Sequence, residues 1–175
     1  MIGEGTAALV SILRGQWARV WNMWEETIRT IPDDEWVKGD TDYLIPARQL
    51  VHTLVCADVF TVDIPLDQYD STKMFGGESW GMPLEELPNR ETALAKLTEV
   101  RVSVKERLAE FDDAALLKPE KTHPWAGQTR MCKMLYVLRH TQHHLGEVNA
   151  ELSRRGIKAA VWEKEKAMLL KQQKL

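Results

Sequence analysis

The sequence predicts an all-α protein: a four-helix bundle with a long crossover between its second and third helices and a helical extension at the C-terminus. Three observations support this prediction. Apolar residues recur at three- and four-residue steps in four long segments, no segment alternates as a β-strand does, and proline and glycine gather between these segments. Because 175 residues fit one ordinary domain, we treat residues 1–175 as a single unit.

The first helix is expected from Thr6 to Thr30, where the apolar positions share one face. Within it, Trp21 and Trp24 fall within about 40° of Trp17 on the helical wheel, so the three tryptophans form one stripe. We expect this stripe to belong to the core. The alternative is that part of it, or the final helix, forms a homodimer face.

The second helix is expected over Pro46 to Thr61, because proline is favoured in the first turn of a helix. The third is expected over Glu91 to Phe111. Between them, the segment from Asp63 to Arg90 contains three prolines and three glycines, which disfavour regular structure. A connection of this length lets two consecutive helices run parallel, because it can cross the whole bundle.

The fourth helix is expected over Arg130 to Arg155, after Thr129 or Gln128 and before Gly156. A fifth helical stretch is expected from Ala159 to about Gln172, as the C-terminal extension.

Composition excludes several classes of function. The net charge of −3 and the pI near 6.0 give no overall positive field, so we expect no nucleic-acid partner. No run of 18 apolar residues occurs and the N-terminus does not look like a signal peptide, so neither a membrane span nor secretion is expected. Cys56 and Cys132 stand far apart without a paired spacing, which favours reduced thiols and a cytoplasmic location.

Three of the five histidines crowd into the fourth predicted helix. His140 and His144 lie about 40° apart on the helical wheel, close enough for both imidazoles to bind one ion, whereas His143 lies about 60° away on the other side. The spacing fits equally well two histidines that are hydrogen-bonded at the helix flank. A zincin metalloprotease is excluded, because Thr141 stands where that motif requires a glutamate.

Two acidic residues, Glu147 and Glu151, follow on the same stripe, within about 20° of His140. Either could orient a metal ligand or act as an acid–base group, although such flank residues are often only solvated. His52 lies in the middle of the second predicted helix among apolar residues. Spacing alone does not make it a ligand, because a lone histidine in that setting is more often a core residue.

The chain resembles the DinB/YfiT-like metalloenzymes over about residues 8 to 156. The resemblance rests on a tryptophan-containing first helix that ends near Ile31-Pro32-Asp33-Asp34, on Leu50-Val51-His52, and on the run from His140 to Glu147. It implies a four-helix bundle with a crossover between helices two and three, in agreement with the connection described above. It also implies that His52, His140 and His144 are the metal ligands, with His143 and His123 outside the ligand shell. Glu147 stands where the family usually has glutamine.

Three imidazoles leave a divalent ion with an open position, as in catalytic sites. Zn and Ni are the expected metals, and Fe, Mn and Cu also accept imidazole ligands. Relatives include enzymes that use a low-molecular-weight thiol, so the resemblance implies a thiol S-transferase acting on a small-molecule substrate, with the loops around Trp80 and Trp125 shaping its pocket. The alternatives are a metal-dependent hydrolase with Glu147 as proton shuttle, and a non-enzymatic, stress-associated metal- or ligand-binding protein. In each case metal affinity is expected to weaken below pH about 6.5, where imidazole takes up a proton.

Overall fold

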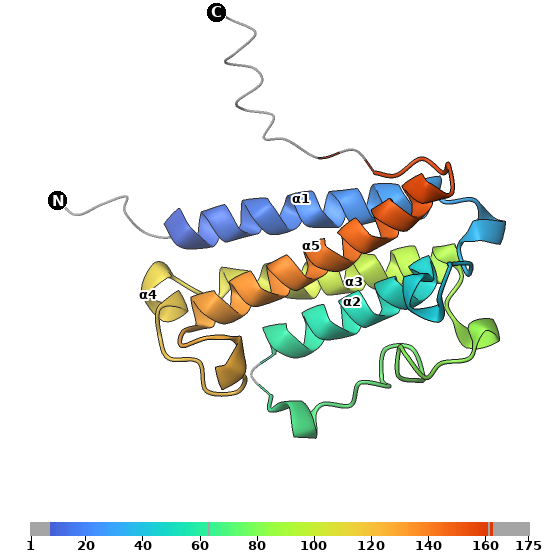
Figure 1. The fold of residues 1–175 in the computed structure, drawn as a ribbon. Helices are drawn as coiled ribbons and strands as arrows, with labels where there is room; N and C mark the ends of the chain where they lie inside the picture. The colour runs from blue at the N-terminus through green and yellow to red at the C-terminus, as the bar shows by residue number, and fades with distance from the viewer. Residues whose placement is uncertain (1–7, 63, 161, 163–175) are drawn as a thin grey trace, which may run out of the picture.

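The computed structural model describes residues 8–62, 64–160 and 162, and most of this part is helical (Figure 1). Its four long helices, in chain order, are α1 Ala8–Thr30, α2 Pro46–Thr61, α3 Arg90–Ala109 and α5 Arg130–Arg154. The all-α prediction is therefore confirmed. No strand occurs in the described ranges, where β pairing is limited to an isolated bridge between Pro119 and Thr129.

Local sequence signals fix the ends of these helices. Pro46 occupies the first turn of α2. The side chains of Asn89 and Thr129 accept hydrogen bonds from the backbone N–H groups of Thr92 and Cys132, which caps α3 and α5. After α5, Gly156 adopts a φ of +72°, a left-handed conformation that ends the helix at little steric cost.

The four long helices pack in a closed ring, in which α1 and α2 each contact both α3 and α5. Figure 1 shows α2 and α3 running in one direction and α1 and α5 running in the other. The second and third long helices are thus parallel, as the length of the connection between them predicts. That connection runs along the bundle from the end of α2 to the start of α3.

The tryptophan stripe of α1 belongs to the core. Trp17, Trp21 and Trp24 are at most 2% exposed. Each buried indole contributes on the order of 4–6 kcal/mol of transfer free energy before chain entropy is counted. The preferred interpretation of the stripe is confirmed, and homodimerisation stays a prediction that these buried side chains do not support.

In its described residues, the crossover carries only short turns of helix, η3 Leu66–Gln68 and η4 Leu84–Glu86. Its position over α2 is fixed by Arg48, which is 3% exposed and donates a hydrogen bond to the backbone oxygen of Ser79. The same guanidinium binds the carboxylate of Asp42 at 3.0 Å. A buried guanidinium therefore holds the segment around Ser79 against the start of α2.

The largest differences from the sequence prediction concern the end of α3 and the C-terminal extension. Helix α3 ends at Ala109 rather than at Phe111, and a short helix, α4 Asp113–Leu116, follows directly. Asp112 caps α4, and the Asp113 carboxylate accepts hydrogen bonds from the first N–H groups of α1, so this turn serves as a cap for another helix. The C-terminal extension is not helical at Ala159 and Ala160, and most of that predicted helix lies outside the described residues.

Within the described part of the chain, none of the helices combines the length and the apolar character that a bilayer span requires.

Candidate metal centre

Helices α2 and α5 bring the three predicted histidines together. The Nε2 atom of His140 lies 3.3 Å from Nε2 of His52 and 3.1 Å from Nε2 of His144. One ring nitrogen from each residue can be chosen so that all three lie within 4.8 Å of one another. Among the described residues, these three form the group of donors that could hold a metal ion.

The spacing of the nitrogen atoms fits a common ion. Two imidazole nitrogens bound at about 2.0–2.1 Å with a tetrahedral angle lie about 3.3 Å apart. The two separations measured from His140, 3.1 and 3.3 Å, agree with that value, and all three donor atoms lie within 4.8 Å of one another. The cluster is therefore suited to bind one divalent ion through three neutral imidazoles.

Burial keeps these imidazoles neutral. It lowers the pKa of His52 to about 3, with a smaller effect from the neighbouring histidines, and it lowers the pKa of His144 to about 3 in the same way. The pKa of His140 is also lowered, mainly by burial. Neutral nitrogens are the form that binds a metal, so the lone pairs of the cluster are available near neutral pH.

Glu147 orients His144. One of its carboxylate oxygens lies 3.0 Å from Nδ1 of His144, on the side of the ring away from the cluster. A carboxylate there holds the proton on Nδ1 and leaves the Nε2 lone pair for the ion. The Tyr43 hydroxyl donates to the same carboxylate at 3.0 Å, and Nε2 of His143 lies 3.3 Å from it.

Two aromatic side chains stand over the cluster. Trp80 of the crossover lies 4.7 Å from the His52 ring, centroid to centroid, and stacks on Tyr43 at 5.0 Å. Both are partly open to solvent, with 40% of Trp80 and 41% of Tyr43 exposed. Together they form an aromatic rim beside the cluster, and the hydrogen bond from Arg48 to Ser79 holds the segment that carries Trp80.

The remaining candidates lie elsewhere. The His143 side chain is 61% exposed, and His123 is fully buried and packs edge-on against Phe60; neither belongs to the cluster. Glu151 accepts hydrogen bonds from the backbone of Asp40 and from Arg154, so it ties a loop to the end of α5 instead of orienting a ligand. Trp125 packs against Phe60 and Tyr136 and does not lie in the rim.

Sequence reasoning missed the support around the histidines. The role of Arg48 could have been inferred from the sequence, because burying a charged residue inside an apolar helical segment costs free energy unless the charge has a partner. The role of Tyr43 could not have been inferred, because the residue that it contacts, Glu147, lies more than 100 residues away in the sequence. The spacing of Cys56 and Cys132 indicated neither a disulfide nor a zinc site, yet the Sγ atom of Cys56 lies 3.7 Å from Nε2 of His52.

Fold and site together define a helical bundle with a three-histidine cluster between two of its helices. The family model of the DinB superfamily matches residues 16–148, a range that contains His52, His140, His144 and Glu147. This match covers most of the chain, which therefore belongs to the DinB superfamily. The comparison with curated proteins gives no match.

Proposed function

We propose that this chain is a divalent-metal-dependent enzyme that transfers a low-molecular-weight thiol to an electrophilic small molecule. The observation that carries the proposal is the position of the His140 Nε2 atom, which lies 3.3 Å from Nε2 of His52 and 3.1 Å from Nε2 of His144. His52, His140 and His144 would hold the ion, with Zn or Ni as the expected metal. A divalent ion supplies one kind of chemistry here: it lowers the pKa of a bound thiol, which then becomes a nucleophile near neutral pH.

An external nucleophile is favoured because burial opposes ionisation of the nearby protein thiol, Cys56. Burial raises the pKa of Cys56 to about 12, so this side chain stays protonated at neutral pH. In the proposed reaction, the sulfur of the small thiol forms a bond to the electrophilic carbon. The leaving group departs with its electron pair, and the thiol proton passes to solvent.

The position of Glu147 favours thiol transfer over hydrolysis. A proton shuttle for water must reach the open side of the site, but this carboxylate lies on the far side of the His144 ring. Its oxygens are also occupied by Tyr43 and His143. We therefore assign Glu147 the role of a positioning residue. The aromatic rim of Trp80 and Tyr43 offers an apolar surface for the electrophile.

The experiment compares thiols at a defined metal content. Protein purified without a nickel column is stripped with a chelator, reloaded with Zn²⁺ or Co²⁺, and assayed with 1-chloro-2,4-dinitrobenzene and cysteine, glutathione, coenzyme A, mycothiol or bacillithiol. We expect a metal-dependent rate that saturates with one of these thiols. We also expect that thiol to produce sulfur-to-cobalt charge-transfer absorption in the Co²⁺ protein. The same assay on His144→Ala should show neither signal.

The alternatives give different results. Turnover of p-nitrophenyl acetate without any thiol would favour the hydrolase. Stoichiometric Zn²⁺ binding with no charge-transfer absorption for any thiol would favour the non-enzymatic binding protein. Equal thiol-transfer rates for the loaded protein and His144→Ala would contradict a role for the cluster.

We also propose a cytoplasmic location. Cys56 and Cys132 are both free thiols, as expected in a reducing compartment. Fractionation of cells that express the full chain tests this assignment.

A further inference from the structure

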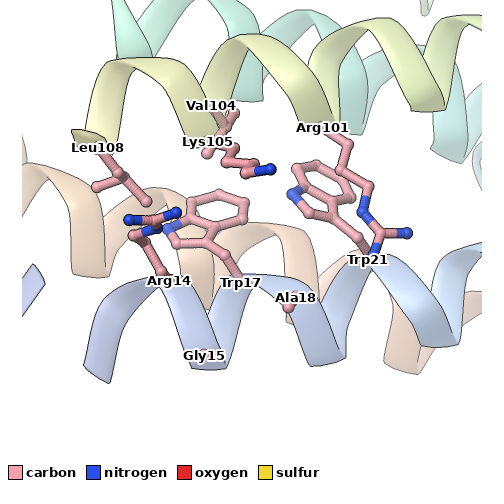
Figure 2. A pocket seen from close by; sticks show the side chains of 9 residues that line it. All are labelled: Arg14, Gly15, Trp17, Ala18, Trp21, Arg101, Val104, Lys105 and Leu108. Carbon is pink, nitrogen blue, oxygen red and sulfur yellow. The ribbon is translucent and has the colours of Figure 1, made fainter. Parts of the chain in front are cut away.

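A cavity of about 410 Å³ lies between α1 and α3. None of its lining residues belongs to α2 or α5, the helices that carry the histidine cluster. Its walls are shown in Figure 2 and comprise Arg14, Gly15, Trp17, Ala18, Trp21, Arg101, Val104, Lys105 and Leu108. The volume lies within the range of small-molecule sites.

Two polar atoms of this cavity are buried without a partner. The indole nitrogens of Trp17 and Trp21 make no hydrogen bond in the described structure, although both side chains are at most 2% exposed. The buried indole nitrogens of Trp24 and Trp36 instead donate to the backbone oxygens of Thr141 and Pro88. Buried donors are nearly always paired, so two neighbouring unpaired donors beside one cavity indicate a place where an acceptor can bind.

Every other polar side chain of the cavity is also a donor. Arg14 and Lys105 form no ion pair with a carboxylate in the described part of the chain, whereas Arg101 lies 3.4 Å from Glu25. Guanidinium, ammonium and indole N–H groups donate hydrogen bonds and accept none. In Figure 2 the Trp21 nitrogen lies on the side of its ring toward Lys105, and the Trp17 nitrogen on the side toward Arg14.

We propose that this cavity binds a small organic carboxylate with a flat apolar body. A carboxylate only accepts hydrogen bonds, so it matches two indole N–H groups and two mobile cations at once. The rings of Trp17 and Trp21 stack at 5.2 Å and, with Val104 and Leu108, provide apolar walls for the rest of the ligand. The long side chains of Arg14 and Lys105 are exposed and can turn to admit it.

The test uses 1-naphthoate as the probe and the indole N–H signals of the full, ¹⁵N-tryptophan-labelled chain as the readout. We expect the Trp17 and Trp21 signals to shift with a common dissociation constant below about 1 mM, while Trp24 and Trp36 stay in place because their donors are already paired. The neutral analogue 1-naphthalenemethanol should bind at least tenfold more weakly, and inorganic phosphate alone should also bind more weakly.

Matched variants locate the site. Lys105→Gln should weaken naphthoate binding about tenfold, because a hydrogen bond to a charged group is lost. Lys96→Gln removes the same charge from α3 but lies outside the cavity, and it should leave the affinity unchanged. His144→Ala should also bind naphthoate normally, which separates this cavity from the metal centre.

Several results would overturn the proposal. Equal affinity for naphthoate and its neutral analogue would show that the charge is not recognised. Equal affinity for phosphate would show that the apolar walls contribute nothing. Uniform shifts of all seven indole signals, or equal effects of Lys105→Gln and Lys96→Gln, would show that binding occurs elsewhere.

Discussion

Replacing Glu147 with glutamine should weaken zinc binding about tenfold without unfolding the protein. The carboxylate lies 3.0 Å from Nδ1 of His144, and the side chain is 23% exposed. A hydrogen bond to a charged acceptor contributes about 1.5–3 kcal/mol and a neutral one about 0.5–1.5 kcal/mol, so the substitution costs His144 about 1–1.5 kcal/mol. That cost corresponds to about a five- to tenfold change in the dissociation constant.

Glu147→Ala removes the acceptor altogether and should approach a hundredfold loss, the upper range for groups that orient a metal ligand. The assay is competition for Zn²⁺ against a chromophoric chelator at pH 7, with circular dichroism to verify the helical fold. Glu99→Gln is the matched control, because it removes one negative charge from an exposed pair with Lys96.

Zinc affinities of Glu147→Gln and Glu147→Ala within twofold of the unchanged protein would refute this reasoning. The carboxylate would then be a solvated flank residue whose contact with His144 has no effect on the ligand. A loss of equal size in Glu99→Gln would refute it as well, since the effect would then come from net charge.

Three further predictions concern the metal ligands, the pH dependence of stability and the buried ion pair of Lys133 and Glu120. His52→Ala and His144→Ala should each lose most bound zinc by elemental analysis, and His143→Ala should retain it; the reverse pattern would contradict the ligand set. Urea unfolding of the zinc-free protein should show stability falling as pH drops from about 6.5 to 5, because only the unfolded chain takes up protons at His52 and His144, whose folded pKa values are about 3. His52→Gln should flatten that dependence, and an unchanged slope would contradict it. Lys133→Met should lower the free energy of unfolding by about 3–5 kcal/mol, because the Glu120 carboxylate, whose side chain is only 1% exposed, loses its partner at 3.0 Å. Adding Glu120→Leu should recover part of this loss. An unchanged free energy of unfolding in Lys133→Met would argue against a stabilising pair.

The lowered pKa values also change the expectation for zinc release. An ordinary imidazole predicts weaker binding below pH about 6.5. In the structure, burial keeps His52 and His144 neutral to lower pH, so zinc should be retained at pH about 6 and released at a lower pH than the sequence alone predicts.

Much of the fold could be predicted from the sequence because its signals are local. Apolar periodicity, Pro46 and the cap at Thr129 located the long helices within a few residues, and the length of the connection after α2 predicted its parallel partner. The i, i+4 spacing of His140 and His144 likewise placed both rings on one side of α5. Patterns of this kind depend on residues within a few turns of one helix, so they can be recognised from the sequence without knowledge of the rest of the molecule.

The sequence by itself thus determined an all-α chain with a histidine pair on its last long helix. Only the tertiary structure showed that His52 closes the cluster, that Glu147 holds His144, and that Arg48 fixes the aromatic rim through Ser79. It also showed that the indole N–H groups of Trp17 and Trp21, between α1 and α3, are buried without a hydrogen-bond partner among the described residues. Each of these features depends on contacts between distant segments, and such contacts are set by how the helices pack rather than by spacing along the chain.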